Sequence, residues 1–526
     1  MRATVDLPLF LPLLESGACI VTPGKRLARE ITESWVRHCE SGSPVIATPR
    51  VTTVDSWLEQ AWSRAVEAGR LPPSRLLTPQ QDLAVWQQLI RSDLEERVGF
   101  SLTHPRAAAQ RAQAAWNKLM MHDGAGLKDL WSAFQYDDDC QVFSEWARRY
   151  SARLSELGAV TRYGAYQQLL TLSVTERPTV GLFTVPDLPP LTRKALDHLT
   201  SVTLIDPGRG NHADLPVQSF TTRDDELFAA AQWARASSAG SGQRVGIVLL
   251  DMASDRNRLE YFLRQEFDCL DARYNDLPVN FATGMPLANT PLFRDALTAL
   301  EWEVSPLSRP RWLSLIRSPY LAFNDEKKII PGLIQAQFLS GSHEISIENT
   351  LHIATRQNPS SQVTGVLRSI RSSRAQKGVK NLGDWTEMIR ERLALWGWPG
   401  RPGLDSIEYQ QLQRLDASLD ALASLAAVLP HQSYESALGL WRDCLAATVF
   451  QPKTPRDSIQ VLGPLEAIGG QFDALWICGA QRGVFPARPR VEPFLPASVQ
   501  KSLGMADIDE SALTEEASRQ IGRAHV

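Results

Sequence analysis

The 526-residue sequence has no closely spaced pair of cysteines. Disulfide frameworks and structural zinc sites use cysteines a few residues apart, so the spacing predicts neither. We therefore expect a reducing compartment and a cytoplasmic protein. The six scattered cysteines are Cys19, Cys39, Cys140, Cys269, Cys444 and Cys478.

The sequence also lacks a long apolar run and an excess of positive charge. Asp6, Pro8 and Pro12 interrupt the short apolar stretch near the N-terminus, and no stretch reaches the roughly 18 apolar residues that a membrane helix needs. We expect no membrane partner. Since 55 Lys and Arg oppose 59 Asp and Glu, the formal net charge is -4, and any nucleic-acid site has to be local.

Motifs for metal-dependent and nucleophilic catalysis are missing as well. His343-Glu344 is not followed by the second histidine of an H-E-x-x-H site, and no G-x-S-x-G motif can be identified. We therefore expect neither a catalytic residue nor a metal ligand within these residues.

What the sequence does contain is an alternation of strand and helix signals. The segments 63–177 and 297–456 are largely helical in pattern, and Asp55 or Ser56 is placed to cap a helix after the β-branched run at 51–54. This order predicts an α/β fold with parallel sheets in two cores, each interrupted by a helical insertion. Apolar, β-prone runs predict buried strands at 18–21, 180–185, 202–205, 244–250, 459–462 and 474–478.

Thr22-Pro23-Gly24-Lys25-Arg26 follows the first predicted strand, where a P-loop would place its Gly-Lys pair. Cys19 stands where the motif needs its first glycine, and Arg26 stands where it needs Ser or Thr for magnesium. The sequence therefore predicts a degenerate phosphate loop. A basic loop at a helix N-terminus can contact a phosphate of a nucleic-acid backbone, and an exposed helix start is the alternative.

Three further features carry weaker signals. Asp187 is a single carboxylate where a magnesium site would need an acidic pair, so a loop role is favoured. The segment 368–380 has five basic and no acidic residues, which fits either nucleic-acid contact or a solvated helix. Arg317 lies near Trp312 in a basic and aromatic stretch that also fits an ordinary buried helix face.

The segment 458–496 has the most specific pattern in the chain. It resembles the late motif region of superfamily 1 helicase relatives, namely the B-subunit type of bacterial helicase–nucleases and related DNA-repair proteins of the PD-(D/E)XK nuclease superfamily. The residues that carry this resemblance are Gly463, Glu466, Gly469, Phe472, Asp473, Trp476, Gly479 and Pro486.

Weaker matches follow in the same order as in that family, at 21–28, 53–58, 181–191, 226–251 and 317–321. The resemblance implies two RecA-like (P-loop NTPase-like) cores with large helical insertions. The implied organisation is a first core at 1–62 and 178–215, an insertion at 63–177, a second core at 216–296 and 457–510, and an insertion at 297–456.

The resemblance also implies a role in DNA repair and recombination. It implies a helicase-like scaffold that binds single-stranded DNA or duplex ends with a degenerate ATP site, with an active helicase subunit as a further partner, and DNA contacts at Thr22, Lys25, Arg26, Trp57 and Arg317. Relatives continue into a Mg²⁺-dependent PD-(D/E)XK nuclease, and some add an iron–sulfur cluster. We expect no cofactor in this fragment. An active ATP-dependent motor using Lys25 and a protein-interaction scaffold without DNA binding are the alternatives.

The last six residues, 521–526, match the translation of a common sequencing adaptor. We therefore expect a gene fragment, truncated before the nuclease domain, whose final residues are a non-native tail.

Overall fold

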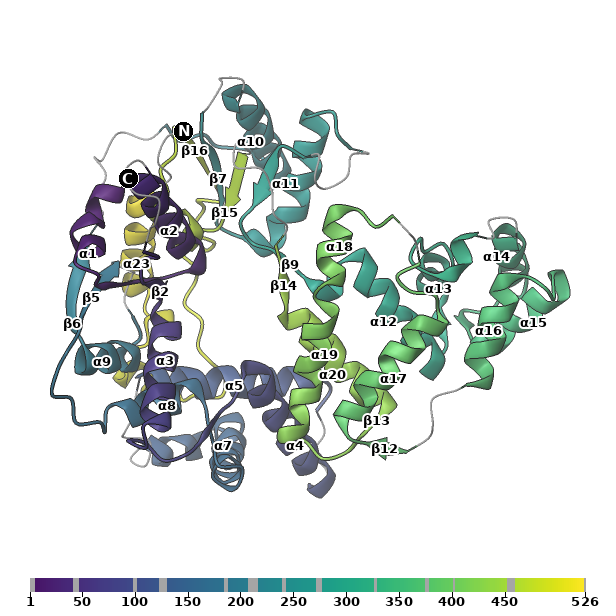
Figure 1. Ribbon diagram of the computed structural model, residues 1–526, viewed down its shortest axis with the longest axis horizontal. Helices are drawn as coiled ribbons and strands as arrows, with labels where there is room; N and C mark the ends of the chain where they lie inside the picture. Colours follow the sequence, from purple (N-terminus) through teal and green to yellow (C-terminus); the bar gives the residue numbers. More distant parts are fainter. Residues whose placement is uncertain are drawn as a thin grey trace. The chain divides into compact units, whose positions relative to one another are not determined.

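The chain is a mixed α/β protein with parallel sheets and many helices (Figure 1). Two compact units form: unit 1 comprises residues 1–78, 89–283 and 453–526, and unit 2 comprises residues 79–88 and 284–452. The helices within the described ranges include none that is both long and apolar enough to cross a membrane. The computed structural model describes residues 5–40, 47–97, 102–122, 130–183, 188–206, 216–238, 243–270, 277–325, 329–373, 378–400, 403–451 and 459–524.

Unit 1 contains two four-stranded parallel sheets. The first has the order β2-β1-β5-β6, with Ile20 of β1 opposite both Val51 and Gly181. Its strands fall where apolar runs predicted them, apart from the short β2, which comes from the β-branched run. They are β1 (Cys19–Thr22), β2 (Val51–Thr53), β5 (Thr179–Phe183) and β6 (Ser201–Ile205).

Both faces of the first sheet are covered. Ile20 and Phe183 pack on one face with residues of η1 (Leu7–Leu9), α1 (Leu11–Glu15) and α2 (Lys25–Glu40). Val21 and Leu182 alternate to the other face, where α3 (Val54–Glu67), α8 (Arg162–Leu169) and α9 (Pro190–Leu199) cover them. A parallel strand buried on both sides must be apolar throughout, which explains the continuous apolar runs.

The second sheet of unit 1 has the order β16-β7-β15-β8 and is also wholly parallel. Ile247 faces α10 (Arg223–Ser238) and α11 (Met252–Glu266), whereas Val248 faces α21 (Pro464–Ala467) and Phe472. The strands are β7 (Val245–Leu249), β8 (Val279–Phe281), β15 (Ile459–Leu462) and β16 (Ala474–Cys478).

The remaining elements of unit 1 are mostly helices. One two-residue parallel pair, β3 (Arg75–Leu76) with β4 (Ala159–Val160), joins a region whose pattern predicted helix almost throughout. The helical elements are α4 (Pro79–Glu96), whose first part belongs to unit 2, α5 (Pro105–His122), η2 (Trp131–Tyr136), α7 (Asp138–Glu156), α22 (Ala497–Ser502), η7 (Ala506–Ile508) and α23 (Glu510–Ala524).

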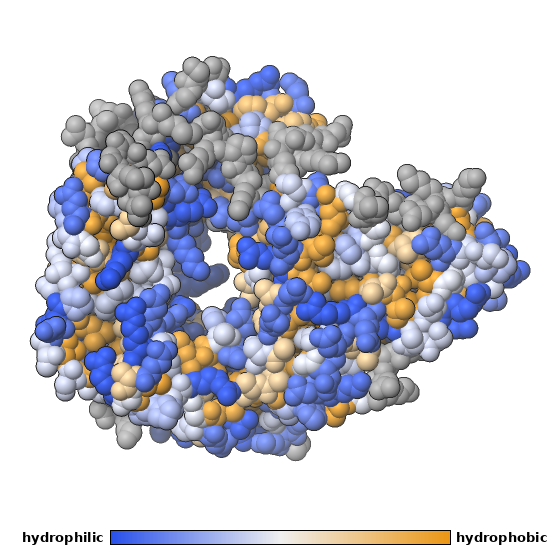
Figure 2. Space-filling model, viewed as in Figure 1, coloured by the Kyte–Doolittle hydropathy of each residue, from blue (hydrophilic) through white to orange (hydrophobic). Residues whose placement is uncertain are grey.

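Unit 2 is largely helical, as its sequence pattern predicts. Figure 2 shows hydrophobic residues gathered around α12 on the visible face of this unit. Its helical elements are η4 (Leu287–Asn289), α12 (Pro291–Val304), α13 (Arg309–Ile316), η5 (Ala322–Asp325), α14 (Ile329–Leu339), α15 (Ile347–Gln357), α16 (Gln362–Ser372), α17 (Leu382–Leu395), α18 (Ser406–Leu412), α19 (Leu415–Ser424), η6 (Leu425–Ala427) and α20 (Tyr434–Ala447).

Short antiparallel pairs connect helices of unit 2 that lie far apart in sequence. The basic segment 368–380 includes the start of one of these pairs. It is not a continuous helix, because α16 ends at Ser372 and β12 begins at Val379. The pairs are β9 (Met285–Pro286) with β14 (Val449–Phe450), β10 (Leu307–Ser308) with β11 (Glu344–Ile345), and β12 (Val379–Lys380) with β13 (Gln432–Ser433).

Candidate nucleic-acid interface

The connection between β1 and α2 is short. Thr22 ends β1 and Lys25 begins α2, so Pro23 and Gly24 alone join them. The buried Thr22 hydroxyl donates to the carbonyl oxygen of Gly24 at 3.0 Å, which holds the turn tight. A phosphate-binding loop needs a longer turn whose backbone N–H groups converge on the phosphates. Lys25 therefore begins an ordinary helix with its side chain in solvent.

Arg26 points to the second sheet of unit 1. Its Nε donates to Glu30 Oε1 at 3.0 Å, and its Nη2 donates to Gln460 Oε1 on β15 at 3.4 Å. The same Gln460 oxygen accepts from Asn280 Nδ2 on β8 at 2.9 Å. Arg26 thus links α2 to two strands of the other sheet, and this structural role competes with contact to a DNA phosphate.

Phe472 and Asp473 of the motif segment hold Arg244 at the start of β7. The Arg244 guanidinium lies over the Phe472 ring, 5.4 Å from its centroid. Asp473 Oδ2 accepts from the Arg244 backbone N–H at 2.8 Å. Burial lowers the pKa of Arg244, an effect that nearby Glu30 opposes. These two motif residues therefore fix the N-terminal end of β7.

The glycines of the motif segment allow close approach between chain segments. Gly469 has a φ of +78°, and a Cβ there would lie 3.2 Å from both Leu27 Cδ1 and Phe183 Cζ of the first sheet's core. Glu466 in α21 folds back on Gly463, since its Oε2 lies 2.5 Å from where a Gly463 Cβ would be. A larger residue at Gly469 would be strained by its positive φ and would press on Leu27 and Phe183, whereas one at Gly463 would displace the Glu466 carboxylate.

The later motif residues pack against α10. Trp476 on β16 lies with its ring centroid 5.4 Å from that of Trp233. The Gly479 backbone N–H donates to Glu226 Oε1 at 2.8 Å, and its φ of +91° suits glycine. Pro486 follows a cis peptide bond. Trp476 and Gly479 therefore connect β16 and its C-terminal end to α10.

Trp57 lies in the first turns of α3. The Thr53 hydroxyl caps this helix by accepting from the Ser56 N–H at 3.3 Å, so the predicted cap at Asp55 or Ser56 is wrong. Asp55 instead accepts from Arg162 Nη1 at 3.1 Å. Trp57 is half-buried against the core of the first sheet, which leaves part of its ring for contact with a ligand.

Arg317 belongs to unit 2, whereas the other four candidates belong to unit 1. It lies directly after α13 with its side chain exposed. The neighbouring Trp312 is fully buried, so this part of the basic and aromatic stretch is a helix core face. Arg317 therefore belongs to a different compact unit from the β1–α2 connection.

A cavity of about 980 Å³ in unit 1 was not predicted from the sequence. Its walls include α5, which contributes Arg111 and Lys118, and the segment 483–493 after β16, which contributes Arg488, Arg490 and Glu492. The segment 483–493 is part of the motif segment 458–496 that carries the helicase resemblance.

Three carboxylates also line this basic cavity, and two of them have partners. Asp507 pairs with Lys118 Nζ at 2.5 Å, and Asp251 accepts from the Ser254 N–H at 3.1 Å as the cap of α11. Burial raises the pKa of Glu492. Arg111, Arg488 and Arg490 form no close ion pair among the residues described, although Arg111 lies near enough to Glu492 to oppose its pKa shift. The cavity therefore offers positive charge on a chain of net negative charge.

Aromatic packing anchors the end of the cavity segment on α7. The Phe494 ring stacks on Phe143 with centroids 5.6 Å apart and an interplanar angle of 8°, and it meets Trp146 edge-on at 5.8 Å. Cys140 Sγ lies 3.4 Å from the Pro493 carbonyl oxygen, and burial raises the pKa of this thiol to about 12. These contacts hold the backbone that follows Arg488 and Arg490 against α7.

Two sequence signals could have indicated the basic cavity. Arg111 and Lys118 are seven residues apart, so they share one face of α5 after two helical turns. Arg488 and Arg490 flank Pro489, which restricts the backbone between them. Their meeting across the fold could not be inferred, because the two pairs are far apart in the chain.

Some predicted features fall outside the described residues. These are Asp187 and the central part, 374–377, of the basic segment. Within the described ranges, no group of three or more His, Cys, Asp or Glu side chains is arranged to hold a metal ion.

Comparison with known proteins gives no relative: no family model matches the chain, and no curated protein matches it. The helicase resemblance therefore depends on the motif residues themselves.

Proposed function

We propose that this chain is part of a DNA repair and recombination protein, a helicase-like scaffold that binds single-stranded DNA. The observation that carries the proposal is the basic cavity of unit 1. Its wall at 483–493 belongs to the segment 458–496 with the helicase-like pattern, and this wall supplies Arg488 and Arg490.

The chemistry of the cavity suits a phosphate backbone. Guanidinium groups bind phosphate oxygens with two parallel hydrogen bonds, and three arginines here have no ion-pair partner in the described parts of the chain. Contacts of this kind bind DNA without reading its sequence. Lys25 and the exposed part of Trp57 are further candidates in the same unit, for a phosphate and a stacked base.

In this proposal the two parallel sheets of unit 1 are RecA-like cores whose ATP site is degenerate. The two-residue connection from β1 to α2 supports this, because it is too short to surround a triphosphate with backbone N–H groups. An active motor that uses Lys25 would have to bind nucleotide by another route. The full-length protein would then perform its chemistry in a C-terminal Mg²⁺-dependent nuclease, beside an active helicase subunit.

The test is fluorescence anisotropy of labelled oligo(dT) with the purified chain, with ATP hydrolysis assayed in parallel. We expect binding without DNA-stimulated hydrolysis. Changing Arg111, Arg488 and Arg490 together to Ala should weaken binding by about 1,000-fold or more, since each charged contact contributes about 1.5–3 kcal/mol and about 1.4 kcal/mol is a factor of ten.

A matched control removes three exposed arginines of unit 1 outside the cavity, Arg70, Arg75 and Arg91. It has the same net charge as the cavity variant and should bind nearly as the wild type. Equal loss in both variants would show that only net charge matters. Hydrolysis that requires Lys25 would favour the active motor, and failure to bind DNA at low salt would favour the protein-interaction scaffold.

A further inference from the structure

Helix α14 in unit 2 is unusually apolar for a helix with a solvent-facing side. None of its eleven residues is charged. Leu333 and Gln337 are buried, and a Cβ on Gly332 would lie 2.9 Å from Gln357 Oε1 of α15, so one face packs closely against that helix. Phe338 is nevertheless 47% exposed. A helix that is apolar on all sides is normally covered on all sides.

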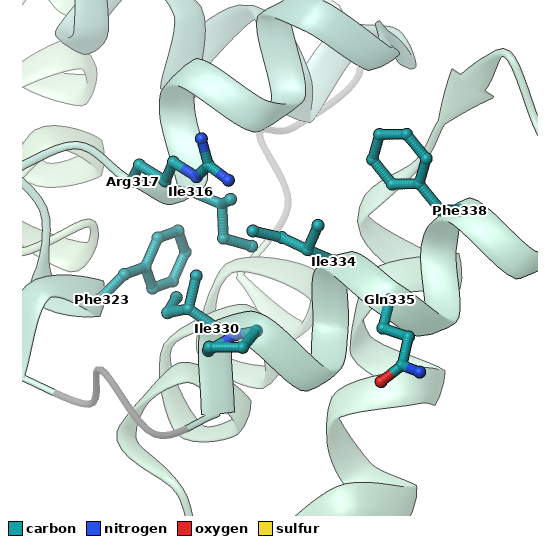
Figure 3. Close-up of a pocket in the computed structure, with 8 residues that line it drawn as sticks. Ile316, Arg317, Phe323, Ile330, Ile334, Gln335 and Phe338 are labelled. Carbon is teal, nitrogen blue, oxygen red and sulfur yellow. The ribbon is translucent and has the colours of Figure 1, made fainter.

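The uncovered face of α14 lines a hollow of about 600 Å³. Figure 3 shows Ile316, Phe323, Ile330 and Ile334 directed at a common centre, with Phe338 farther along α14. Ile330, Ile334 and Phe338 are four residues apart, which places them on one helix face. A hollow of this size accommodates one or two large apolar side chains of a ligand.

Arg317 is the one charged residue among the described residues that line this hollow. Figure 3 shows its guanidinium beside Ile316, at the margin of the apolar centre. Within the described residues it has no hydrogen-bond or ion-pair partner, unlike Arg311 and Arg442, which both pair with Glu301. An unpaired cation beside an apolar hollow is complementary to a carboxylate next to a large apolar side chain.

We propose that this hollow binds a peptide segment of a partner protein in which a large apolar residue lies next to acidic residues. The apolar side chain fills the space between Ile316 and Ile334, and a carboxylate pairs with Arg317. The proposal is independent of DNA binding by unit 1.

The lining favours a peptide over a nucleic acid. A DNA strand needs several cations spaced along its phosphates and exposed aromatic faces for its bases. Here Arg317 is the one charged side chain in the described lining, and Phe323 is fully buried. The guanidinium of Arg309 already lies over the ring of Phe338, 4.9 Å from its centroid, so that face is not open to a base. Arg317 is therefore better matched to a peptide carboxylate than to the DNA contact that the sequence suggested.

The test measures anisotropy of short fluorescein-labelled peptides with the full chain. One probe alternates Phe with Asp, a second alternates Phe with Lys, and a third alternates Ser with Asp. We expect the Phe/Asp probe to bind most tightly, and Arg317→Ala and Phe338→Ala each to weaken it by about tenfold. Arg356→Ala, which removes an exposed arginine of α15 outside the hollow, should leave binding unchanged.

Circular dichroism establishes that each variant is folded, and Arg317→Lys tests whether charge alone suffices. Equal binding of the Phe/Lys probe, or unchanged binding by Arg317→Ala, would overturn the proposal. Competition of oligo(dT) with the Phe/Asp probe in the triple variant of Arg111, Arg488 and Arg490 would show that the hollow takes DNA instead.

Discussion

At the scale of single residues, unit 2 holds a buried ion pair with several hydrogen bonds. Arg392, 1% exposed, donates from Nε to Glu303 Oε2 at 2.8 Å, and Trp396 Nε1 donates to Glu303 Oε1 at 2.7 Å. Arg392 Nη2 also donates to the Ile370 carbonyl oxygen at 3.2 Å. The pair therefore ties α17 to α12 and α16.

Removing one partner of this pair leaves the other charge buried. We expect Arg392→Ala to destabilise the protein by about 3–5 kcal/mol. Arg390→Ala on the same helix removes a partly exposed pair with Asp416 and should cost less than about 1 kcal/mol. Urea unfolding followed by tryptophan fluorescence compares the two variants. Similar losses of unfolding free energy in the two variants would contradict the claim that a buried ion pair is the costlier one to break.

Glu492 predicts a pH dependence of DNA binding. Burial raises its pKa, and Lys118 and Arg111 oppose that shift. As pH rises through this raised pKa, Glu492 gains negative charge and repels phosphate, so affinity for DNA should fall. Glu492→Gln should raise affinity above that pKa by about two- to fivefold and reduce the pH dependence. It should also stabilise the fold there, because a raised pKa means that the folded state favours the neutral form.

Anisotropy titrations with oligo(dT) from pH 5 to 8 at fixed ionic strength measure this effect. Identical pH profiles of DNA affinity for the wild type and Glu492→Gln would show that Glu492 does not lie at the DNA interface.

At the scale of elements, most strands of the two parallel sheets were predictable, whereas the three-residue β8 and the short pairs were not. A strand buried on both faces is marked by a continuous apolar run, as at Val245–Leu249. Two-residue pairs such as β3 with β4 are too short to produce a periodic pattern. The basic cavity was missed for another reason: its arginines lie on elements that only the tertiary fold brings together.

Gly181 shows how tightly α1 packs on the first sheet. A Cβ there would lie 2.5 Å from Leu13 Cδ1 and 2.9 Å from Ile205 Cδ1. We expect Gly181→Ala to destabilise unit 1 by about 1–3 kcal/mol, because the neighbours must move. Gly365→Ala in α16 meets open space and should stabilise its helix by up to about 1 kcal/mol. Thermal unfolding of both variants checks this contrast, and a neutral Gly181→Ala would contradict it.

At the scale of the whole molecule, a net charge of -4 means that DNA affinity must come from a local concentration of cations. The central claim is that the unpaired arginines of the cavity in unit 1 supply it. Each phosphate that a protein neutralises on single-stranded DNA contributes about 0.7 to the slope of log affinity against log salt.

The most direct measurement is therefore that slope, determined with oligo(dT) for the wild type, the triple variant of Arg111, Arg488 and Arg490, and the control variant of Arg70, Arg75 and Arg91. The account predicts that the triple variant loses about 2 from the slope while the control keeps the wild-type value. Equal slopes in all three proteins would contradict it.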